Sequence, residues 1–286
     1  MMLVFSKTCL RHHRHPHHLR VLTSAHAHLH LHLHRHHREM STASASTTTN
    51  NSRHPSSSAT SDSCNVTERV RSLVGRNLHR ESAHPITTVK NLVHESFNKS
   101  MEMVDGQCGI GHHQSNTKEM AKAYELFDSF EPIVTTKACF DDLLVPKDHV
   151  SRSYSDTFYI DEHHVLRTHT SAHQTALMRQ QNTAFLVAGD CYRRDEIDAQ
   201  HYPCFHQMEG VRLFHRDELP SNEKDAEHAV VQHLKSSLQH MVSDVFAQGN
   251  KHVEKQRWID AYFPFTHPSV GLSSPSPSPS PSPSVV

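Results

Sequence analysis

Apolar residues recur at helical spacing in two stretches of the chain. The first stretch follows His84, and Pro85 suits the first turn of a helix because its φ angle is already helical and it lacks a backbone N–H. Its apolar positions are Ile86, Val89, Leu92, Val93 and Phe97. Those of the second stretch are Val230, Leu234, Leu238, Met241, Val242 and Val245. Both patterns predict amphipathic helices that bury one face.

The region between these helices is predicted to form mostly short strands. Residues 184–193 and 204–214 are two longer, largely apolar runs, and residues 157–160 and 165–168 flank a turn-like segment, as in a hairpin. Shorter apolar pieces lie at residues 127–134 and 140–144. Helices grouped around hairpin-connected strands predict an α+β fold, with an antiparallel sheet flanked by helices.

The two ends of the chain lack such patterns. The first 40 residues contain arginine and lysine but no acidic residue before Glu39, and serine and threonine dominate residues 41–63. A leader that is rich in arginine and serine and poor in acids is typical of an organelle transit peptide. Ser-Pro repeats from Ser274 favour extended, solvated backbone at the other end. We therefore expect a disordered leader, a folded domain and a disordered tail over residues 1–65, 66–269 and 270–286.

Composition narrows the class of protein. The six cysteines contain no Cys-x-x-Cys pair, which favours a reducing compartment over a disulfide framework. A formal net charge of -1 gives no overall basic field, and no run approaches the roughly 20 apolar residues that span a bilayer. Histidines crowd the leader and alternate with leucine at residues 29–34, either as a metal-binding tract or, as we favour, as low-complexity sequence.

The strand over residues 204–214 carries the first candidate site residues. Alternate side chains of a strand share a face, so Phe205, Gln207 and Glu209 should point one way and their neighbours the other. On the preceding strand Arg193 and Asp195 likewise share a face. An arginine fork matches phosphate oxygens and an aromatic ring can stack on a base, which suits an adenine nucleotide. A sheet surface with a plain Arg193–Glu209 ion pair is the alternative that spacing leaves open.

A second candidate element is the segment from His169 to Gln174. Ser171 and Gln174 have the spacing of a capping box, which predicts that a helix starts here. His169 and His173, four residues apart, offer a metal site as an alternative, but no carboxylate accompanies them at metalloprotease spacing. We therefore favour the helix start, whose N–H groups are also suited to binding a ligand.

Two further interpretations concern aromatic residues and cysteines. Phe263 and Phe265 flank Pro264, and such an aromatic cluster serves either as core or as a set of ring edges for an aromatic ligand. The remaining alternative is a zinc site, for which the candidate ligands are Cys191, His201, Cys204 and His206. Because strand alternation places these side chains on different faces, they should not converge on one tetrahedral centre, and we expect no metal site.

Three strings, taken together and in this order, resemble the phenylalanyl-tRNA synthetase family, most closely its single-chain organellar form. They are residues 166–174, 192–214 and 258–269, and the resemblance covers residues 67–269. It implies the class II aminoacyl-tRNA synthetase fold, an antiparallel sheet flanked by helices. It also implies ATP-dependent activation of phenylalanine to the adenylate, followed by transfer to tRNA(Phe).

The resemblance also implies a role for each candidate residue. In the catalytic machinery, Arg193 would bind the α-phosphate and the substrate carboxylate, and His201 would reach the ATP phosphates. Phe205 would stack on adenine, and Asp195 stands where a glutamate often lies near the adenine amino group. The residues that would hold the ammonium and carboxylate groups of phenylalanine are His169, Ser171, Gln174, Gln207 and Glu209. Phe263 and Phe265 would grip its phenyl ring.

Cofactor, partners and location follow from the same resemblance. We expect ATP with Mg2+, a monomer, no membrane association, and a place in the mitochondrial matrix, the plastid or both. The family's glycine-rich third motif and its anticodon-binding domain do not follow Ser269, so the sequence predicts a catalytic domain that is incomplete at its C-terminus. The alternatives are an inactive fragment with residual ligand binding and, less favoured, a histidine- and cysteine-based metal-binding protein.

Overall fold

A seven-stranded sheet organises the part of the chain that the structure describes. The computed structural model describes residues 2–6, 21–25, 64–110, 123–194, 202–247, 257–260 and 269–273. From one edge to the other the strands are β3 (Glu125–Phe127), β6 (Ala184–Tyr192), β7 (Cys204–Phe214), β2 (Val21–Ala25), β1 (Met2–Ser6), β9 (Ser269–Ser273) and β8 (Arg257–Asp260). Neighbouring strands are antiparallel except β3 and β6, which are parallel. The expected antiparallel sheet therefore carries one parallel strand at its edge.

The central hairpin of the sheet is β6 with β7, and it confirms the two longer predicted strands. Its register runs from Ala184 opposite Arg212 to Tyr192 opposite Cys204. Every residue of β6 is buried, so both faces of this strand are covered. This double burial explains why the sequence of β6 is a nearly continuous apolar run without strict alternation.

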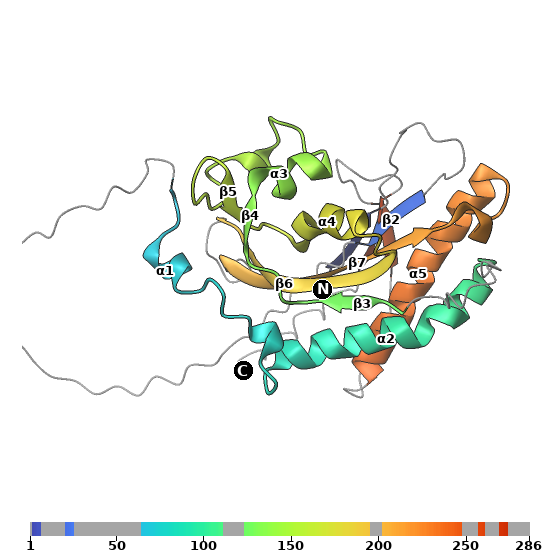
Figure 1. Cartoon of the computed structure of the whole chain (residues 1–286). Helices are drawn as coiled ribbons and strands as arrows, with labels where there is room; N and C mark the ends of the chain where they lie inside the picture. The colour runs from blue at the N-terminus through green and yellow to red at the C-terminus, as the bar shows by residue number, and fades with distance from the viewer. Residues whose placement is uncertain are drawn as a thin grey trace, which may run out of the picture.

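Two long helices cover one face of the sheet (Figure 1). These are α2 (Pro85–Gln107) and α5 (Glu223–Ala247), which confirm the two amphipathic predictions and extend beyond them. His84 precedes α2, and its Nδ1 accepts a hydrogen bond from the backbone N–H of Ile86 at 3.2 Å, which satisfies a donor of the first turn. The apolar core between helices and sheet includes Phe97, Met101, Leu186, Met208, Leu238 and Met241.

A buried charge cluster joins α2, β7 and α5. Arg212 donates to both carboxylate oxygens of Asp105 at 2.7 Å, and Nε2 of His233 lies 2.9 Å from Oδ1 of the same carboxylate. Burial favours the protonated acid, but the hydrogen bonds from His233 and Arg212 outweigh it and lower the pKa of Asp105 below its ordinary value. The end of α2 is thus fixed to the middle of the sheet by a fully paired charge.

Small elements cover the opposite face of β6 and β7 (Figure 1). A two-stranded sheet pairs β4 (Ile133–Thr135) with β5 (His164–Leu166). The predicted hairpin that ends at β5 is present only as one bridge, between Tyr159 and Val165, so the ladder of β5 forms with β4 instead. The remaining elements on this face are α3 (Thr136–Cys139), η2 (Asp141–Leu143), η4 (Thr170–His173) and α4 (Gln174–Arg179).

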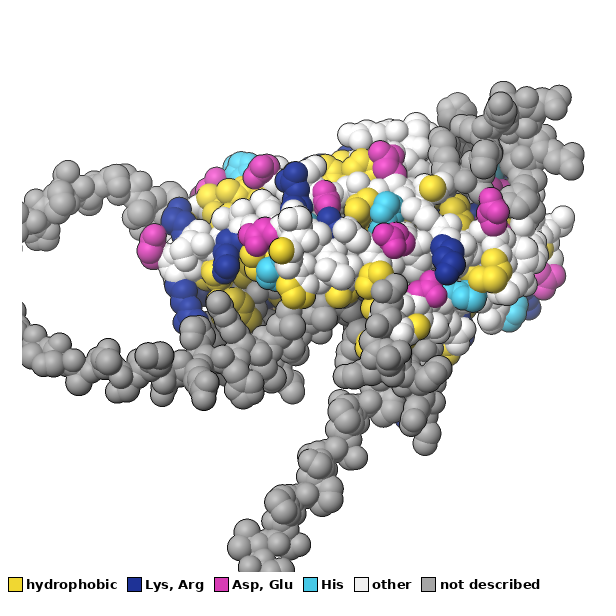
Figure 2. All heavy atoms as spheres, turned by 90° about the horizontal axis from the view of Figure 1, so that it is seen from below, with side chains coloured by type: hydrophobic (Ala, Val, Ile, Leu, Met, Phe, Trp, Pro, Cys, Tyr) yellow, Lys and Arg dark blue, Asp and Glu magenta, His cyan; other side chains and the backbone are white. Residues whose placement is uncertain are grey.

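The remaining short elements of the described residues are helical. They are α1 (Glu68–Arg71), η1 (Leu78–Arg80), η3 (Val150–Arg152) and η5 (Arg216–Glu218). Seen from below, toward α2 and α5, the surface has basic and acidic side chains interspersed with apolar ones (Figure 2). Within the described ranges, none of the helices is both long and apolar enough to cross a membrane.

Two short segments of the leader, which we expected to be disordered, form strands. Met2–Ser6 and Val21–Ala25 form strands β1 and β2, and β2 pairs antiparallel with β7 from Val21 opposite Phe214 to Ala25 opposite Gly210. The edge of β7 has unpaired backbone N–H and C=O groups, and an extended segment such as β2 can satisfy them by hydrogen bonding. The transit-peptide assignment of the leader stays a prediction, and so do the domain boundaries. Strand β9 also extends past the expected boundary at Ser269.

Candidate active site

Three alternate residues of β7 form the floor of the candidate site. Glu209 accepts a hydrogen bond from Oγ of Ser171 at 2.6 Å, and Oε1 of Gln207 faces the thiol of Cys191 at 3.8 Å. The Phe205 ring lies under the guanidinium of Arg193, with 5.1 Å from Cζ to the ring centroid. These contacts confirm that the three side chains share one face and that this face lies toward η4.

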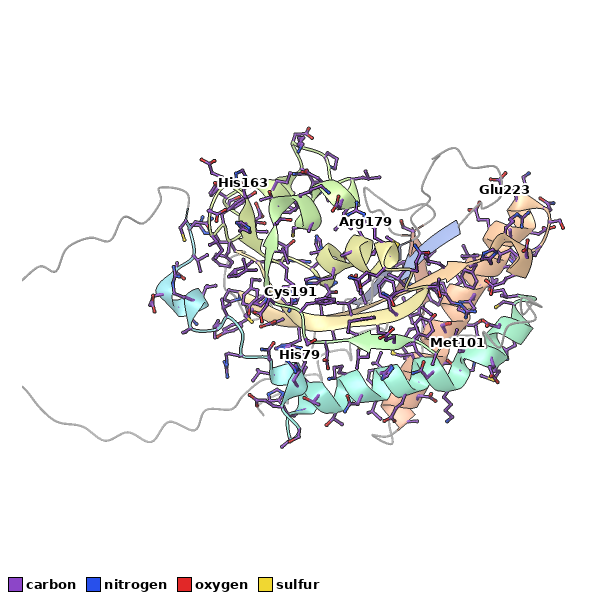
Figure 3. All side chains as sticks on the ribbon, viewed as in Figure 1. His79, Met101, His163, Arg179, Cys191 and Glu223 are labelled. Atoms are coloured by element: carbon purple, nitrogen blue, oxygen red, sulfur yellow. The ribbon has the colours of Figure 1, made fainter. Side chains whose placement is uncertain are left out.

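The opposite face of β7 packs against the helices and carries none of the candidate substrate-binding residues. Met208 packs into the core against α2 and α5, and the His206 ring lies 5.4 Å from the ring of His79. Figure 3 shows His79 on the helix side of the sheet, while Cys191 lies on β6. The predicted separation of the faces is therefore present on both strands of the hairpin.

Glu209 is the most strongly perturbed acid of the site. Its side chain is buried, and burial raises its pKa to about 7, although the hydrogen bond from Ser171 partly offsets this effect. A carboxyl group with a pKa near 7 takes up or gives up its proton readily when a charged ligand arrives. A ligand ammonium group would favour the ionised form.

Gln207 provides a buried donor at the same site. Its side chain is only 2% exposed, and its Nε2 atom has no hydrogen-bond partner among the described residues. Buried polar groups in native proteins almost always have a partner, and a group without one marks a place for a ligand or an ordered water. The amide therefore fits an acceptor on a bound ligand, such as a carboxylate oxygen.

The predicted helix start is present, because the 3-10 turn η4 leads into α4, but the predicted capping box is wrong. The 3-10 helix η4 follows His169 and α4 begins at Gln174, and neither start has a side-chain cap. The Ser171 hydroxyl instead donates to Glu209, which lies 38 positions later in the chain. The carboxyl group of Glu209 accepts the hydroxyl proton and so fixes the direction of this side chain, because hydrogen bonds to charged acceptors are the stronger ones.

His169 and His173 do not form the alternative metal site. Nε2 of His173 lies 3.1 Å from Nη1 of Arg167, and its ring stacks on Phe130 with 4.3 Å between the centroids. Burial and the nearby Arg167 charge lower the pKa of His173 to about 3, so this ring is neutral at pH 7. Its Nε2 lone pair already accepts a hydrogen bond from Arg167 and is not free to bind a metal ion. His169 lies just before η4, beside the same turn.

Arg193 lies at the end of the hairpin, above Phe205. Its Nε donates to the carbonyl oxygen of Thr168 at 3.2 Å, so the segment before η4 fixes the guanidinium over the ring. The alternative cross-strand pair of Arg193 with Glu209 is not among the ion pairs of the described residues. An arginine held over a ring offers a cation for phosphate next to a surface on which a base can stack.

Four predicted site residues lie outside the described residues. They are Asp195, His201, Phe263 and Phe265, and their roles stay predictions. The zinc alternative included His201 as well, but Cys191 faces Gln207 while His206 lies on the other face of the hairpin. Among the described residues no group of three or more histidine, cysteine, aspartate and glutamate side chains is arranged to hold a metal ion.

The sequence interpretation missed one residue of the site, Arg167. Its side chain is 1% exposed and donates to Asp190 from Nη2 at 2.7 Å. Since arginine is rarely buried, an arginine at the end of a predicted strand indicated a surface position. The sequence signal for its burial was Gly189-Asp190, a glycine and an acid within the otherwise apolar strand β6. A buried acid in such a strand requires a charged partner.

The family is settled by comparison with known sequences. The profile of the family described as "tRNA synthetases class II core domain (F)" matches residues 116–276. The chain belongs to this family. The expected class II fold is thereby confirmed, and β6 with β7 is a hairpin of a class II synthetase core domain.

Relatives of this class II core domain include organellar enzymes. The chain is 41% identical to "Phenylalanine--tRNA ligase, chloroplastic/mitochondrial" of Arabidopsis thaliana, over 73% of this chain and 43% of the relative. It is 40% identical to "Phenylalanine--tRNA ligase, mitochondrial" of Mus musculus, over 73% of this chain and 47% of the relative. The corresponding protein of Dictyostelium discoideum is 40% identical, over 72% of this chain and 45% of that protein. The chain thus spans less than half the length of these curated relatives.

Proposed function

We propose that this class II core domain belongs to a phenylalanine–tRNA ligase, which activates phenylalanine with ATP and transfers it to tRNA(Phe) in an organelle. The observation that carries the proposal is the buried group of Ser171, Gln207 and Glu209, which offers a carboxylate and an amide donor at one place. This pair suits the ammonium and carboxylate groups of an amino acid. The names of the relatives support phenylalanine as that amino acid.

Glu209 would bind the ammonium group. With a pKa of about 7 the free site contains both forms of the carboxyl group at neutral pH, and a bound ammonium would shift it to the carboxylate. Ser171 orients one carboxylate oxygen through its hydrogen bond. We assign supporting roles around the same group to His169 and Gln174, because His169 directly precedes η4 and Gln174 begins α4, beside Ser171.

Arg193 and Phe205 would bind ATP. The ring would stack on adenine, and the guanidinium above it would bind the α-phosphate and the substrate carboxylate, with His201 and Asp195 as further contacts. In the reaction a carboxylate oxygen attacks the α-phosphorus, and the bond to the pyrophosphate oxygen breaks. The residues act mainly by positioning the two substrates and by stabilising the negative charge that develops on the phosphate.

Mg2+ would arrive with the phosphates of ATP and neutralise part of their charge. No described group of acidic side chains is arranged to hold this ion, so we assign no step of the reaction to a protein-bound metal. The organellar relatives support the mitochondrial matrix or the plastid as the location, with residues 1–65 as the transit peptide. We also propose a monomer.

Phe263 and Phe265 would hold the phenyl ring. An apolar pocket rejects a ligand with one added hydroxyl by only about a hundredfold, so tyrosine should compete measurably. A far larger rejection of tyrosine would contradict a pocket that is purely apolar.

ATP–pyrophosphate exchange by the purified chain is the experiment that tests the proposal. We expect exchange that depends on phenylalanine and that is lost in Arg193→Gln, while the exposed Lys147→Ala serves as the control variant. If phenylalanine binds in calorimetry but no exchange occurs, the alternative of an inactive fragment with residual binding is correct. If phenylalanine does not bind and the protein contains bound zinc, the metal-binding alternative replaces the proposal.

A further inference from the structure

We infer that Arg167 is a positioning residue for the amino acid, because its guanidinium fixes the turn that brings Ser171 to Glu209. The inference rests on the proposed function, and it adds a residue that does not itself touch the substrate. Its starting point is a fully buried arginine that the proposed mechanism leaves unused.

Arg167 connects three parts of the fold at one place. Its Nε donates to the backbone oxygen of Asp190 and its Nη2 to the carboxylate of the same residue, both at 2.7 Å. Its Nη1 donates to the carbonyl oxygen of Phe130 at 3.0 Å and to Nε2 of His173 at 3.1 Å. One guanidinium therefore joins β6, the segment before β4 and the last residue of η4. A rigid planar group that donates in these directions permits few other arrangements.

The partner aspartate is itself fixed. Oδ2 of Asp190 accepts a hydrogen bond from the hydroxyl of Tyr192 at 2.5 Å. Burial opposes the ionised form, but this hydrogen bond and the charge of Arg167 outweigh it and lower the pKa of Asp190 below its ordinary value. The pair therefore stays ionised across the pH range in which the proposed enzyme would work, and the turn is held by a permanent charge.

Gly189 makes room for the guanidinium. A Cβ atom at this position would lie 2.3 Å from Nη2 and 2.8 Å from Cζ of Arg167. Side-chain ends usually move aside at little cost, but this one is bonded to Asp190 and His173, and moving it breaks those bonds. Gly189 also lies opposite Gln207 in the ladder, so the guanidinium lies beside the floor of the site.

The side chain and the backbone of Arg167 support different parts of the site, the amino-acid side at Ser171 and the ATP side at Arg193. The backbone of Arg167 is held in place by hydrogen bonds to Pro132 and from Tyr192, both at 2.9 Å, and the next residue, Thr168, accepts from Arg193. The guanidinium instead reaches His173, two positions after Ser171. Loss of the guanidinium contact should therefore displace Ser171 while Thr168 and Arg193 stay in place. Phenylalanine affinity should fall and ATP affinity should not.

Substitutions of His173 test this separation without placing a new group in the core. His173→Phe keeps a ring that can stack on Phe130 but removes the acceptor for Arg167, whereas His173→Gln restores an acceptor. We expect His173→Phe to weaken phenylalanine binding at least tenfold and to change ATP binding less than twofold. His173→Gln should recover most of the loss. Gly189→Ala, which displaces the guanidinium directly, should resemble His173→Phe.

A second ligand separates positioning from general loosening of the site. The amine-free analogue 3-phenylpropanoate does not need Ser171 and Glu209, so its affinity should be the same in wild type and His173→Phe. Calorimetry with phenylalanine, the analogue and ATP gives all three affinities, and thermal unfolding shows that each variant is folded. If His173→Phe binds phenylalanine as wild type does, or weakens all three ligands equally, the inference is wrong while the proposed function stands. If wild type itself does not bind phenylalanine, both are overturned.

Discussion

Replacing Glu209 with glutamine should make the protein more stable at high pH. Burial raises the pKa of this carboxyl from its ordinary value of 4.5 to about 7, so the fold favours the neutral acid. The stability that this group contributes is fully present below its pKa in the unfolded chain, and it is lost as the pH rises through its higher pKa in the folded protein. At about 1.4 kcal/mol per pKa unit, the difference costs the wild type about 3 kcal/mol at pH 8. Glutamine has the same shape and no charge to bury, so Glu209→Gln avoids this cost.

The pH dependence of the gain is the decisive measurement. Urea unfolding of wild type and Glu209→Gln should give a difference of about 3 kcal/mol at pH 8 and less than about 1 kcal/mol at pH 5. Glu162→Gln changes an exposed carboxyl and is the matched control, with no difference expected at either pH. Equal stability at pH 8, or a gain of the same size at both pH values, would refute the argument. Phenylalanine binding should be lost in Glu209→Gln, so the site costs stability for the sake of binding.

Three further outcomes follow from the buried contacts. Asp105→Asn leaves Arg212 without its buried charge partner and should lower the free energy of unfolding by about 3–5 kcal/mol, measured by urea unfolding. The control Lys147→Ala, at an exposed position, should lower it by about 1 kcal/mol or less. Leu238→Ala removes a side chain that is 0% exposed and should cost about 2–5 kcal/mol, with a Tm fall that thermal unfolding measures. Phe205→Leu removes a stacking surface worth about 1–3 kcal/mol per base, so calorimetry should show ATP affinity falling at least fivefold while phenylalanine affinity stays within twofold.

The longer helices and strands could be predicted from their apolar patterns. Helices α2 and α5 and strands β6 and β7 were all found from their sequence patterns, because burial along a long element repeats often enough to be recognised. The sharing of one face by Phe205, Gln207 and Glu209 followed from strand geometry alone. The candidate floor of the site could therefore be predicted before the fold was known.

The contacts that arrange this floor could not be predicted in the same way. Ser171 matched a local capping pattern, but its partner is a carboxylate that is distant in sequence, and no short-range rule contains that information. Strand β3 has three residues, too few for a pattern to show that it pairs in parallel with β6. Strand β2 lies in a leader whose average composition conceals five residues suited to a strand. Arg167 was missed because its burial depends on Asp190, which only the folded chain brings close.

The packing of α2 against α5 means that the apolar face of α2 is exposed during translation. Ser96 of α2 donates to Asp244 of α5 at 2.7 Å, and the apolar faces of the two helices meet in one core. Helix α2 ends at Gln107 and α5 ends at Ala247, so 140 residues must be added before its partner is complete. At about 5–20 residues per second, α2 waits roughly 7–28 seconds with Phe97 and Met101 uncovered. We therefore expect a chaperone to bind the nascent chain at α2 and to leave when α5 emerges.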